Sequence, residues 1–258
     1  RTVRVRVAGA AAARRLHYLE WVASNRRAVH EKSGGRCGYL HMADMEEGGY
    51  EDFSRDYWGE ASSGQAALLL DLRGNEGGHV SELVLQRLSQ PRLAVESPPH
   101  GRSAHVPYLA PPANLVVLID EATSSDGEVV AAYLSSAAGA ALVGARTWGG
   151  VYAMDTTELV DGTTVSHPSY AFQIRNGGEY LENNGVAPDT EVFLSPDDHA
   201  AGRDPQLDAA VGIAMQRADA SDAAGEAPPT DDERRRAPAG GGGPRGRRRG
   251  NGKGMRRR

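Results

Sequence analysis

The chain has 258 residues, of which 40% are apolar and 24% charged, with a net charge of -5 and a single cysteine, Cys37. That length suits one sizeable domain with extensions. One cysteine excludes an internal disulfide and a cysteine metal site, and it fits a cytoplasmic setting. No apolar run is long enough to span a membrane, so we expect no membrane association.

Charge is unevenly distributed along the chain. Residues 234–258 contain 11 Lys and Arg and no acid, so residues 1–233 hold 18 bases against 34 acids, a net charge of -16. We expect residues 219–258, rich in Ala, Gly, Pro and Arg, to form a disordered tail. Its Arg-Gly clusters lack interleaved aromatic residues, which disfavours a dedicated nucleic-acid partner.

The pattern of apolar residues predicts alternating strands and helices. Thr2–Val7 alternates like a half-buried strand but has no partner before it, which suggests that a preceding domain is missing. Further strands are expected at Cys37–Met42, Gln65–Leu72, Leu115–Ile119 and Ala141–Ala145. Helices are expected at Ala11–Lys32, Gly48–Glu60, Val80–Leu88, Ser125–Ala137 and Pro205–Ala218. Residues 96–112 and 176–188 are expected to be loops, and 153–173 antiparallel strands turning at Asp161-Gly162.

Strand-helix alternation predicts an α/β fold with a mostly parallel sheet and flanking helices. Ligands on such sheets collect at the carboxyl ends of the strands. Two polar segments follow strands there: Gly74-Asn75-Glu76-Gly77-Gly78, and the residues leading to Ser125.

Ser125 is placed where a strand turns into a helix. The first amides of a helix are unpaired and the dipole there is positive, which suits a nucleophile beside an oxyanion hole. Ser125-Asp-Gly-Glu128 is also a capping-box pattern, so a simple helix cap is the alternative that this stretch alone favours.

Two motifs in order, Asp71-Leu-Arg-Gly-Asn-Glu-Gly-Gly and Asp120-Glu-Ala-Thr-Ser-Ser-Asp-Gly-Glu, resemble the tail-specific protease domain of the S41 serine peptidases. Three further segments resemble the tricorn branch: Gly38-Tyr-Leu-His-Met-Ala-Asp-Met, Gly144-Ala-Arg-Thr-Trp-Gly-Gly-Val and Tyr180-Leu-Glu-Asn-Asn-Gly-Val-Ala-Pro-Asp. The resemblance implies a ClpP–crotonase-like core over residues 12–218, with residues 1–11 as a strand or linker left from a PDZ-like domain. It implies no cofactor and no metal.

The resemblance also implies roles for single residues. Ser125 matches the nucleophile, and the amides of Asp126 and Gly78 match the oxyanion donors. Glu182 matches the glutamate that orients the histidine through a second serine. Glu96 aligns with an acidic residue that reaches a neighbouring subunit's site and favours basic P1 side chains, so peptide substrates and a homo-oligomer of the full-length protein are implied.

The general base is missing from this pattern. In the tricorn branch the histidine follows a serine in an N-terminal subdomain, and no Ser-His step occurs in the first hundred residues here. The Ser-Lys dyad of related peptidases is not available either, because Gly150 stands at the lysine's place and no lysine occurs between Lys32 and Lys253. His79, next to the oxyanion glycines, and His41 are expected to be structural.

The sequence therefore predicts a tricorn-like serine endopeptidase that acts on peptides or unfolded protein, as a C-terminal half without its base. A catalytically inactive peptide-binding module of the same fold is the alternative. A crotonase-like acyl-CoA enzyme is disfavoured, because nothing in that chemistry requires Ser125 and Glu182 at this spacing.

Overall fold

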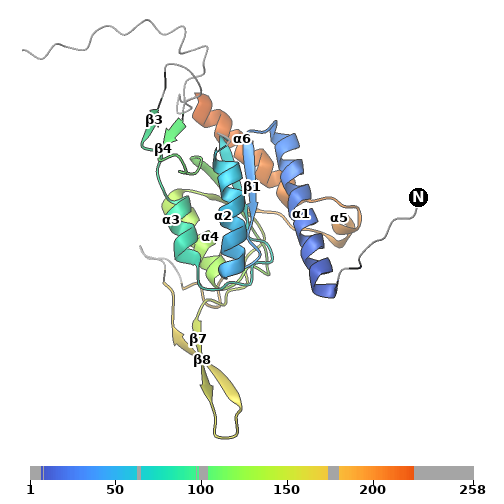
Figure 1. The fold of residues 1–258 in the computed structure, drawn as a ribbon, viewed down its shortest axis with the longest axis vertical. Coiled ribbons are helices and arrows are strands. Elements are labelled where there is room, and N and C mark those ends of the chain that lie inside the picture. The colour runs from blue at the N-terminus through green and yellow to red at the C-terminus, as the bar shows by residue number, and fades with distance from the viewer. Residues whose placement is uncertain are drawn as a thin grey trace, which may run out of the picture. The chain divides into compact units, whose positions relative to one another are not determined.

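The computed structural model describes residues 7, 9–62, 65–96, 98, 104–173 and 180–223. Within them, five strands form one sheet in the order β1-β2-β5-β6-β9, and every pairing in it is parallel (Figure 1). The strands are β1 Cys37–His41, β2 Ala67–Asp71, β5 Asn114–Ile119, β6 Ala141–Gly144 and β9 Thr190–Glu191. The predicted α/β class is confirmed.

Helices cover both faces of the sheet (Figure 1). One face packs against α2 (Glu47–Ser62), α3 (Ser81–Leu88) and α4 (Asp126–Ala138), and the other against α1 (Ala10–Ser33) and α6 (Pro205–Ala223). In β2, Leu68 and Leu70 face the first group, whereas Ala67 and Leu69 face the second. A strand buried on both sides has no polar face, which explains the continuous apolar run from which it was predicted.

Glycine ends two of these helices in the left-handed conformation. Gly34 follows α1 with φ 61°, as its sequence position predicts, and Gly139 follows α4 with φ 65°. None of the helices in the described ranges has the combined length and apolarity that crossing a lipid bilayer requires.

The structure differs from the predicted elements in several places, and one of these is the two-residue strand β9, which was not predicted. Residues 96–112 were expected to be a loop, but their first part belongs to a short antiparallel hairpin of β3 (Ala94–Glu96) and β4 (Ala104–Val106). A five-residue helix, α5 (Pro196–Ala200), was not predicted. Helix α6 continues to Ala223 rather than ending at Ala218, and Arg36 pairs with Asp219 and Asp222 in this added turn. The strand expected at Thr2–Val7 lies outside the described residues except for Val7, and residues 224–258 lie wholly outside them.

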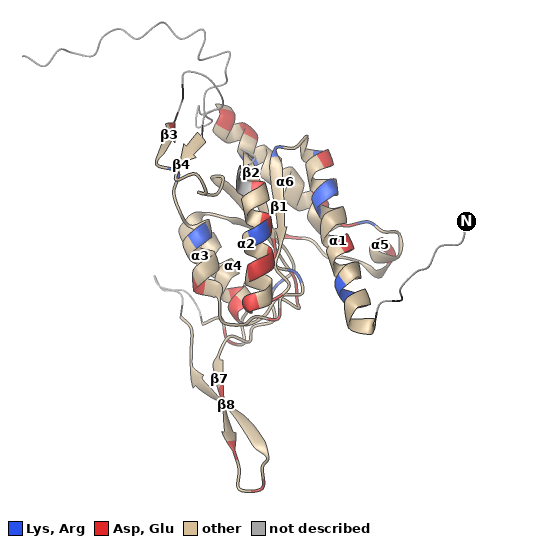
Figure 2. Ribbon diagram, viewed as in Figure 1, with Lys and Arg blue, Asp and Glu red and all other residues tan. Residues whose placement is uncertain are grey.

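The predicted antiparallel strands form a separate hairpin of β7 (Ala153–Glu158) and β8 (Thr164–Tyr170). Its turn contains Gly162 with φ 85°, at the predicted position. Nearly all of its side chains are exposed, and they include acidic residues but no Lys or Arg (Figure 2).

Candidate active site

Loops that follow four of the parallel strands meet at the carboxyl edge of the sheet. Backbone hydrogen bonds join them: Ser124 N donates to Asn75 O at 2.8 Å, Ser125 N to Gly150 O at 3.1 Å, and Met45 N to Gly77 O at 2.7 Å. Ser125 therefore lies where the loops after β2, β5 and β6 converge.

Ser125 has an unusual backbone conformation. It is the N-cap residue of α4, with φ 53° and ψ -124°, a region that residues other than glycine rarely adopt. Such a conformation costs about 1–3 kcal/mol and persists only where the surrounding contacts enforce it. Its half-buried side chain projects from a sharp strand-to-helix turn, the geometry of an exposed serine nucleophile.

Two consecutive positions in the turn beside Ser125 require glycine. Gly77 has φ 88°, and a Cβ there would lie 2.5 Å from Ser125 Cβ and 3.1 Å from Asp126 N. Gly78 has φ 149°, and a Cβ there would lie 2.3 Å from the Met45 carbonyl. These contacts explain why two glycines follow each other in the sequence.

The amides of Gly78 and Asp126 are available to an incoming oxygen. Met45 bonds through its own N–H and carbonyl to Gly77 O and His79 N, so the N–H of Gly78 points away from Met45. Neither the Gly78 nor the Asp126 amide donates to an acceptor within the described part of the chain. Two free amides close to a serine side chain are what an oxyanion hole needs.

Asn75 holds the glycine turn in place. Its side chain is fully buried, with Nδ2 donating to Met42 O at 2.9 Å and Oδ1 accepting from Gly77 N at 2.9 Å. Gly127 packs closely on it, because a Cβ there would lie 2.9 Å from Asn75 Oδ1. One amide side chain thus joins the loops after β1, β2 and β5.

The side chain of Asp126 links the N-termini of two helices. Its carboxylate accepts from Ser81 N, the first residue of α3, at 3.2 Å. Burial raises the pKa of Asp126, and the hydrogen bonds from Ser81 oppose that rise. This contact fixes the start of α4, and with it the peptide that carries the Asp126 amide.

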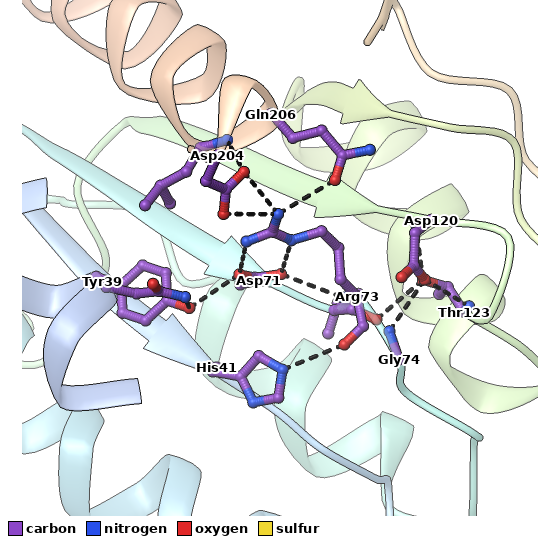
Figure 3. A network of polar contacts seen from close by, with 12 residues as sticks. Tyr39, His41, Asp71, Arg73, Gly74, Asp120, Thr123, Asp204 and Gln206 are labelled. Atoms are coloured by element: carbon purple, nitrogen blue, oxygen red, sulfur yellow. Dashed lines mark hydrogen bonds and ion pairs between the residues drawn. The ribbon is translucent and has the colours of Figure 1, made fainter. Parts of the chain in front are cut away.

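A buried ion network anchors the glycine turn to α6 (Figure 3). Arg73 donates to Asp71 at 2.9 and 2.7 Å through Nε and Nη2, and through Nη1 to Asp204 at 2.9 Å and Gln206 at 3.1 Å. Burial alone would raise the pKa of Asp71, but Arg73 outweighs burial and holds that pKa below its usual value. The start of the turn is therefore fixed to the first turn of α6.

His41 belongs to the same network and is structural, as predicted (Figure 3). Its Nδ1 lies 2.9 Å from the Tyr18 hydroxyl, and its Nε2 lies 3.2 Å from Arg73 O. Burial lowers the pKa of His41. Both ring nitrogens are engaged away from Ser125, so this histidine cannot take the proton of the serine.

The other described histidines with assigned partners are also occupied elsewhere. The exposed His79 pairs with Glu46 at 3.0 Å and approaches Glu47 at 3.8 Å, while His30 contacts Glu60 and His105 contacts Arg92. No histidine in the described ranges hydrogen-bonds to Ser125 Oγ. The three ligand atoms of Glu46, Glu47 and His79 lie within 4.8 Å of one another on the surface, and the contact between Glu46 and His79 accounts for that proximity.

Glu182 is brought to the site without touching Ser125. Its Oε2 accepts from Val151 N at 2.8 Å and from Tyr152 N at 3.0 Å. These two amides follow Gly150, whose carbonyl accepts from Ser125 N. The carboxylate of Glu182 is therefore one short loop away from Ser125.

Glu96 is not brought to Ser125 within one chain. It is exposed at the end of β3, in the connection between α3 and β5, and Figure 1 places that hairpin at the opposite end of α3 from the site loops. Its predicted role in a neighbouring subunit's site is consistent with this separation and stays a prediction.

Sequence reasoning missed the role of Glu128. This residue is fully buried and accepts from Ser125 N at 3.1 Å, Gly149 N at 2.7 Å and Gly150 N at 3.0 Å, and also from the Thr147 hydroxyl. The Ser-x-x-Glu spacing signalled only a capping box. The bonds to residues 147–150 depend on tertiary structure and leave no local trace in the sequence.

Comparisons with known proteins agree with this geometry. The family model of Peptidase family S41 matches residues 36–192. Tricorn protease homolog 1 of Streptomyces coelicolor is 42% identical over 216 residues, which is 83% of this chain and 20% of that protein. The tricorn protease of Thermoplasma acidophilum is 35% identical over 202 residues, which is 78% of this chain and 19% of that protein.

A solved structure shows the same likeness in three dimensions. The crystal structure of the tricorn protease superposes with a TM-score of 0.71 at 35% identity, over 77% of this chain and 19% of that one. The chain thus spans about a fifth of the length of these tricorn relatives. The chain belongs to peptidase family S41, within its tricorn branch.

Proposed function

We propose that this chain carries the nucleophile-bearing part of a serine endopeptidase that cleaves peptides or unfolded protein. The observation that supports this most strongly is Ser125 itself. Its backbone is strained, it precedes the Asp126 amide, and it packs on Gly77, which precedes the Gly78 amide; neither amide donates to an acceptor in the described residues. In this proposal Ser125 Oγ attacks the substrate carbonyl, and the Gly78 and Asp126 amides receive the developing negative charge.

We further propose that the general base comes from outside the described residues. A serine hydroxyl needs a base to take its proton, and the described histidines with assigned partners are engaged elsewhere. His100 lies outside the described residues. Loss of a triad member costs about 10⁴–10⁶ in rate, so this chain alone should show near-background turnover. Glu182 would orient the base through an intervening serine.

The substrate proposal is a peptide with a basic residue before the cleaved bond. Glu96 supplies the negative charge, and because its hairpin lies away from Ser125, it would act on a second copy in a homo-oligomer. The excess of acids over bases before residue 234 also favours basic peptides over nucleic acids. A cytoplasmic location remains a proposal that rests on the lone buried cysteine.

Hydrolysis of a fluorogenic peptide with a basic P1 residue tests this function. The chain is assayed alone, with added imidazole as a diffusible base, and within a longer gene product that supplies a Ser-His segment. We expect turnover only in the last two cases, and none in a Ser125→Ala variant under any condition. Turnover that survives Ser125→Ala would contradict the proposal.

A non-catalytic peptide-binding module is the second candidate, favoured by the lack of a base on Ser125 among the described histidines. Strand addition at β1 is disfavoured, because Glu60 already accepts from Tyr39 N at 3.1 Å and Arg26 donates to Tyr39 O at 3.5 Å. This candidate predicts peptide affinity that is unchanged by Ser125→Ala, with no turnover even when the base is supplied.

A further inference from the structure

The carboxylate of Glu128 is a fully buried negative charge surrounded by donors from two separate segments. One donor is Ser125 N at 3.1 Å, and the others are Gly149 N at 2.7 Å, Gly150 N at 3.0 Å and the Thr147 hydroxyl. No Lys or Arg in the described ranges forms an ion pair with it. Hydrogen bonds and the positive end of α4 therefore compensate its charge.

This arrangement does more than cap a helix. Of Glu128, a capping box requires only that its carboxylate accept a hydrogen bond from the amide of the N-cap residue, Ser125. The remaining bonds reach a loop about twenty residues further along the chain, after β6. Stabilisation of the helix start alone gives no reason for them.

The same loop continues directly into the two amides that bind the carboxylate of Glu182. Val151 N and Tyr152 N donate to Glu182 Oε2 at 2.8 and 3.0 Å, immediately after the amides that bind Glu128. Ser125 N also donates to Gly150 O at 3.1 Å. Glu128 and Glu182 thus hold consecutive amides of one loop, and Ser125 is bonded to both that loop and Glu128.

The strained conformation of Ser125 depends on these contacts. Most N-cap residues adopt the extended region, whereas Ser125 has φ 53°. Its N–H is shared between Glu128 Oε2 and Gly150 O, which fixes the direction of the preceding peptide. Without the carboxylate, two amides and a hydroxyl of the loop would lose their acceptor and the serine could relax.

We propose that Glu128 is a positioning residue of the active site, which holds Ser125 in its reactive conformation and keeps the loop that binds Glu182 in register with it. This inference rests on the proposed function, because it concerns the reactivity of Ser125. Glu128 acts through Ser125 and the loop and does not touch the substrate.

The test measures the rate at which a fluorophosphonate probe labels Ser125 in this chain, with imidazole added as a base and the modified residue identified by mass spectrometry. Glu128→Gln keeps the shape of the side chain but presents N–H groups to two of the donors. A displacement of about 1 Å at a reacting group costs about 10²-fold in rate, and we expect a loss of that order. Glu128→Asp, which keeps the charge, should restore part of the rate.

Glu60→Gln is the matched control for the loss of a buried carboxylate. Glu60 is 7% exposed and also accepts a backbone amide, Tyr39 N, but it contacts β1 and α1 rather than the site. We expect its labelling rate to stay within about twofold of the wild type. If Glu128→Gln labels as fast as Glu60→Gln, the positioning role is wrong.

Hydrogen exchange provides a second readout that needs no reactivity. The proposal expects Glu128→Gln to lose amide protection at Ser125 and across residues 149–152, while a pure cap would lose it only at the start of α4. Should Glu128→Gln not fold, Thr147→Val removes one donor, and we expect it to lose about tenfold in labelling while Thr147→Ser keeps most of the rate. Absent labelling of the wild type contradicts the proposed function, whereas unchanged exchange at residues 149–152 contradicts the positioning role.

Discussion

The backbone of Ser125 is strained, and the surrounding contacts enforce that strain. A substitution that relieves the strain should therefore raise the stability of the folded protein while it removes the reactivity of this position. Glycine adopts positive φ freely, whereas alanine keeps the strain and removes only the hydroxyl. We expect the free energy of unfolding of Ser125→Gly to be about 1 kcal/mol larger than that of Ser125→Ala, although neither variant can be labelled by the fluorophosphonate probe at this position. Urea denaturation of the two variants measures the difference, and equal stabilities would contradict the strain.

Gly77 and Gly74 separate the cost of backbone conformation from the cost of crowding. Both have positive φ, but a Cβ at Gly77 would meet Ser125, whereas a Cβ at Gly74 would meet nothing within 4 Å. We expect Gly74→Ala to cost about 1 kcal/mol and to leave Ser125 reactive. Gly77→Ala should cost several kcal/mol more and abolish labelling. Similar behaviour of the two variants in denaturation and labelling would show that the turn is not packed on Ser125.

The buried His41 predicts a dependence of stability on pH. Burial lowers the pKa of folded His41 below its usual value of about 6.5, so below that pH the unfolded state binds the extra proton and folding weakens. The groups that face it are Tyr18, Asp71, Arg73 and Asp120. The stability contribution is complete above about pH 6.5 and is lost as the pH falls toward the lower folded value.

Urea midpoints between pH 7 and pH 5 for the wild type and His41→Gln measure this effect. The wild type should lose stability more steeply, because glutamine has no proton to bind but can still reach Arg73 O. Parallel curves for the two proteins would exclude His41 as a cause of the pH dependence.

At the scale of elements, Arg73 connects the turn after β2 to the start of α6. Arg73→Met leaves Asp71, which is fully buried, without its cation and should cost about 3–5 kcal/mol. The exposed pairs of Arg36 with Asp219 and Asp222 join the residue before β1 to the end of α6, and Arg36→Met should cost less than about 1 kcal/mol. Thermal melting of both variants tests this difference in stability. An equal fall in the two melting temperatures would contradict it.

The elements that sequence reasoning recovered are those whose signal is local. β2 and β5 are continuous apolar runs, and α1 ends at the glycine that its position predicts. Strands β3, β4 and β9 were not predicted, because each contains only two or three residues and so shows no periodicity. The end of α6 was missed because charged residues there pair with Arg36, a residue distant in sequence.

The candidate site shows the same division between local signals and tertiary contacts. The positions of Ser125, Gly78 and Glu182 came from motifs, and the structure brings the loops that carry them to one edge of the sheet. The structure adds that Gly77, rather than Gly78, packs against Ser125, and that Glu128 holds the serine and the loop together. Close packing and buried carboxylates depend on chain segments that meet only after folding, so a sequence motif cannot specify them.

At the scale of the whole molecule, this chain spans about a fifth of the length of the two tricorn relatives described above. Its sheet, its two cores and its site loops are nonetheless complete enough to hold Ser125 in a strained conformation. In the function that we propose, these residues place the nucleophile, and its activation requires a base from outside the described residues.

The most direct measurement compares the rate of fluorophosphonate labelling at Ser125 in this chain alone with that in a longer gene product carrying a Ser-His segment. We predict labelling near background in the chain alone and labelling at least about 10³-fold faster in the longer protein, since a triad member contributes about that much or more. Fast labelling of the chain alone would show that a base is already present. An unlabelled Ser125 in the active longer protein would show that it is not the nucleophile.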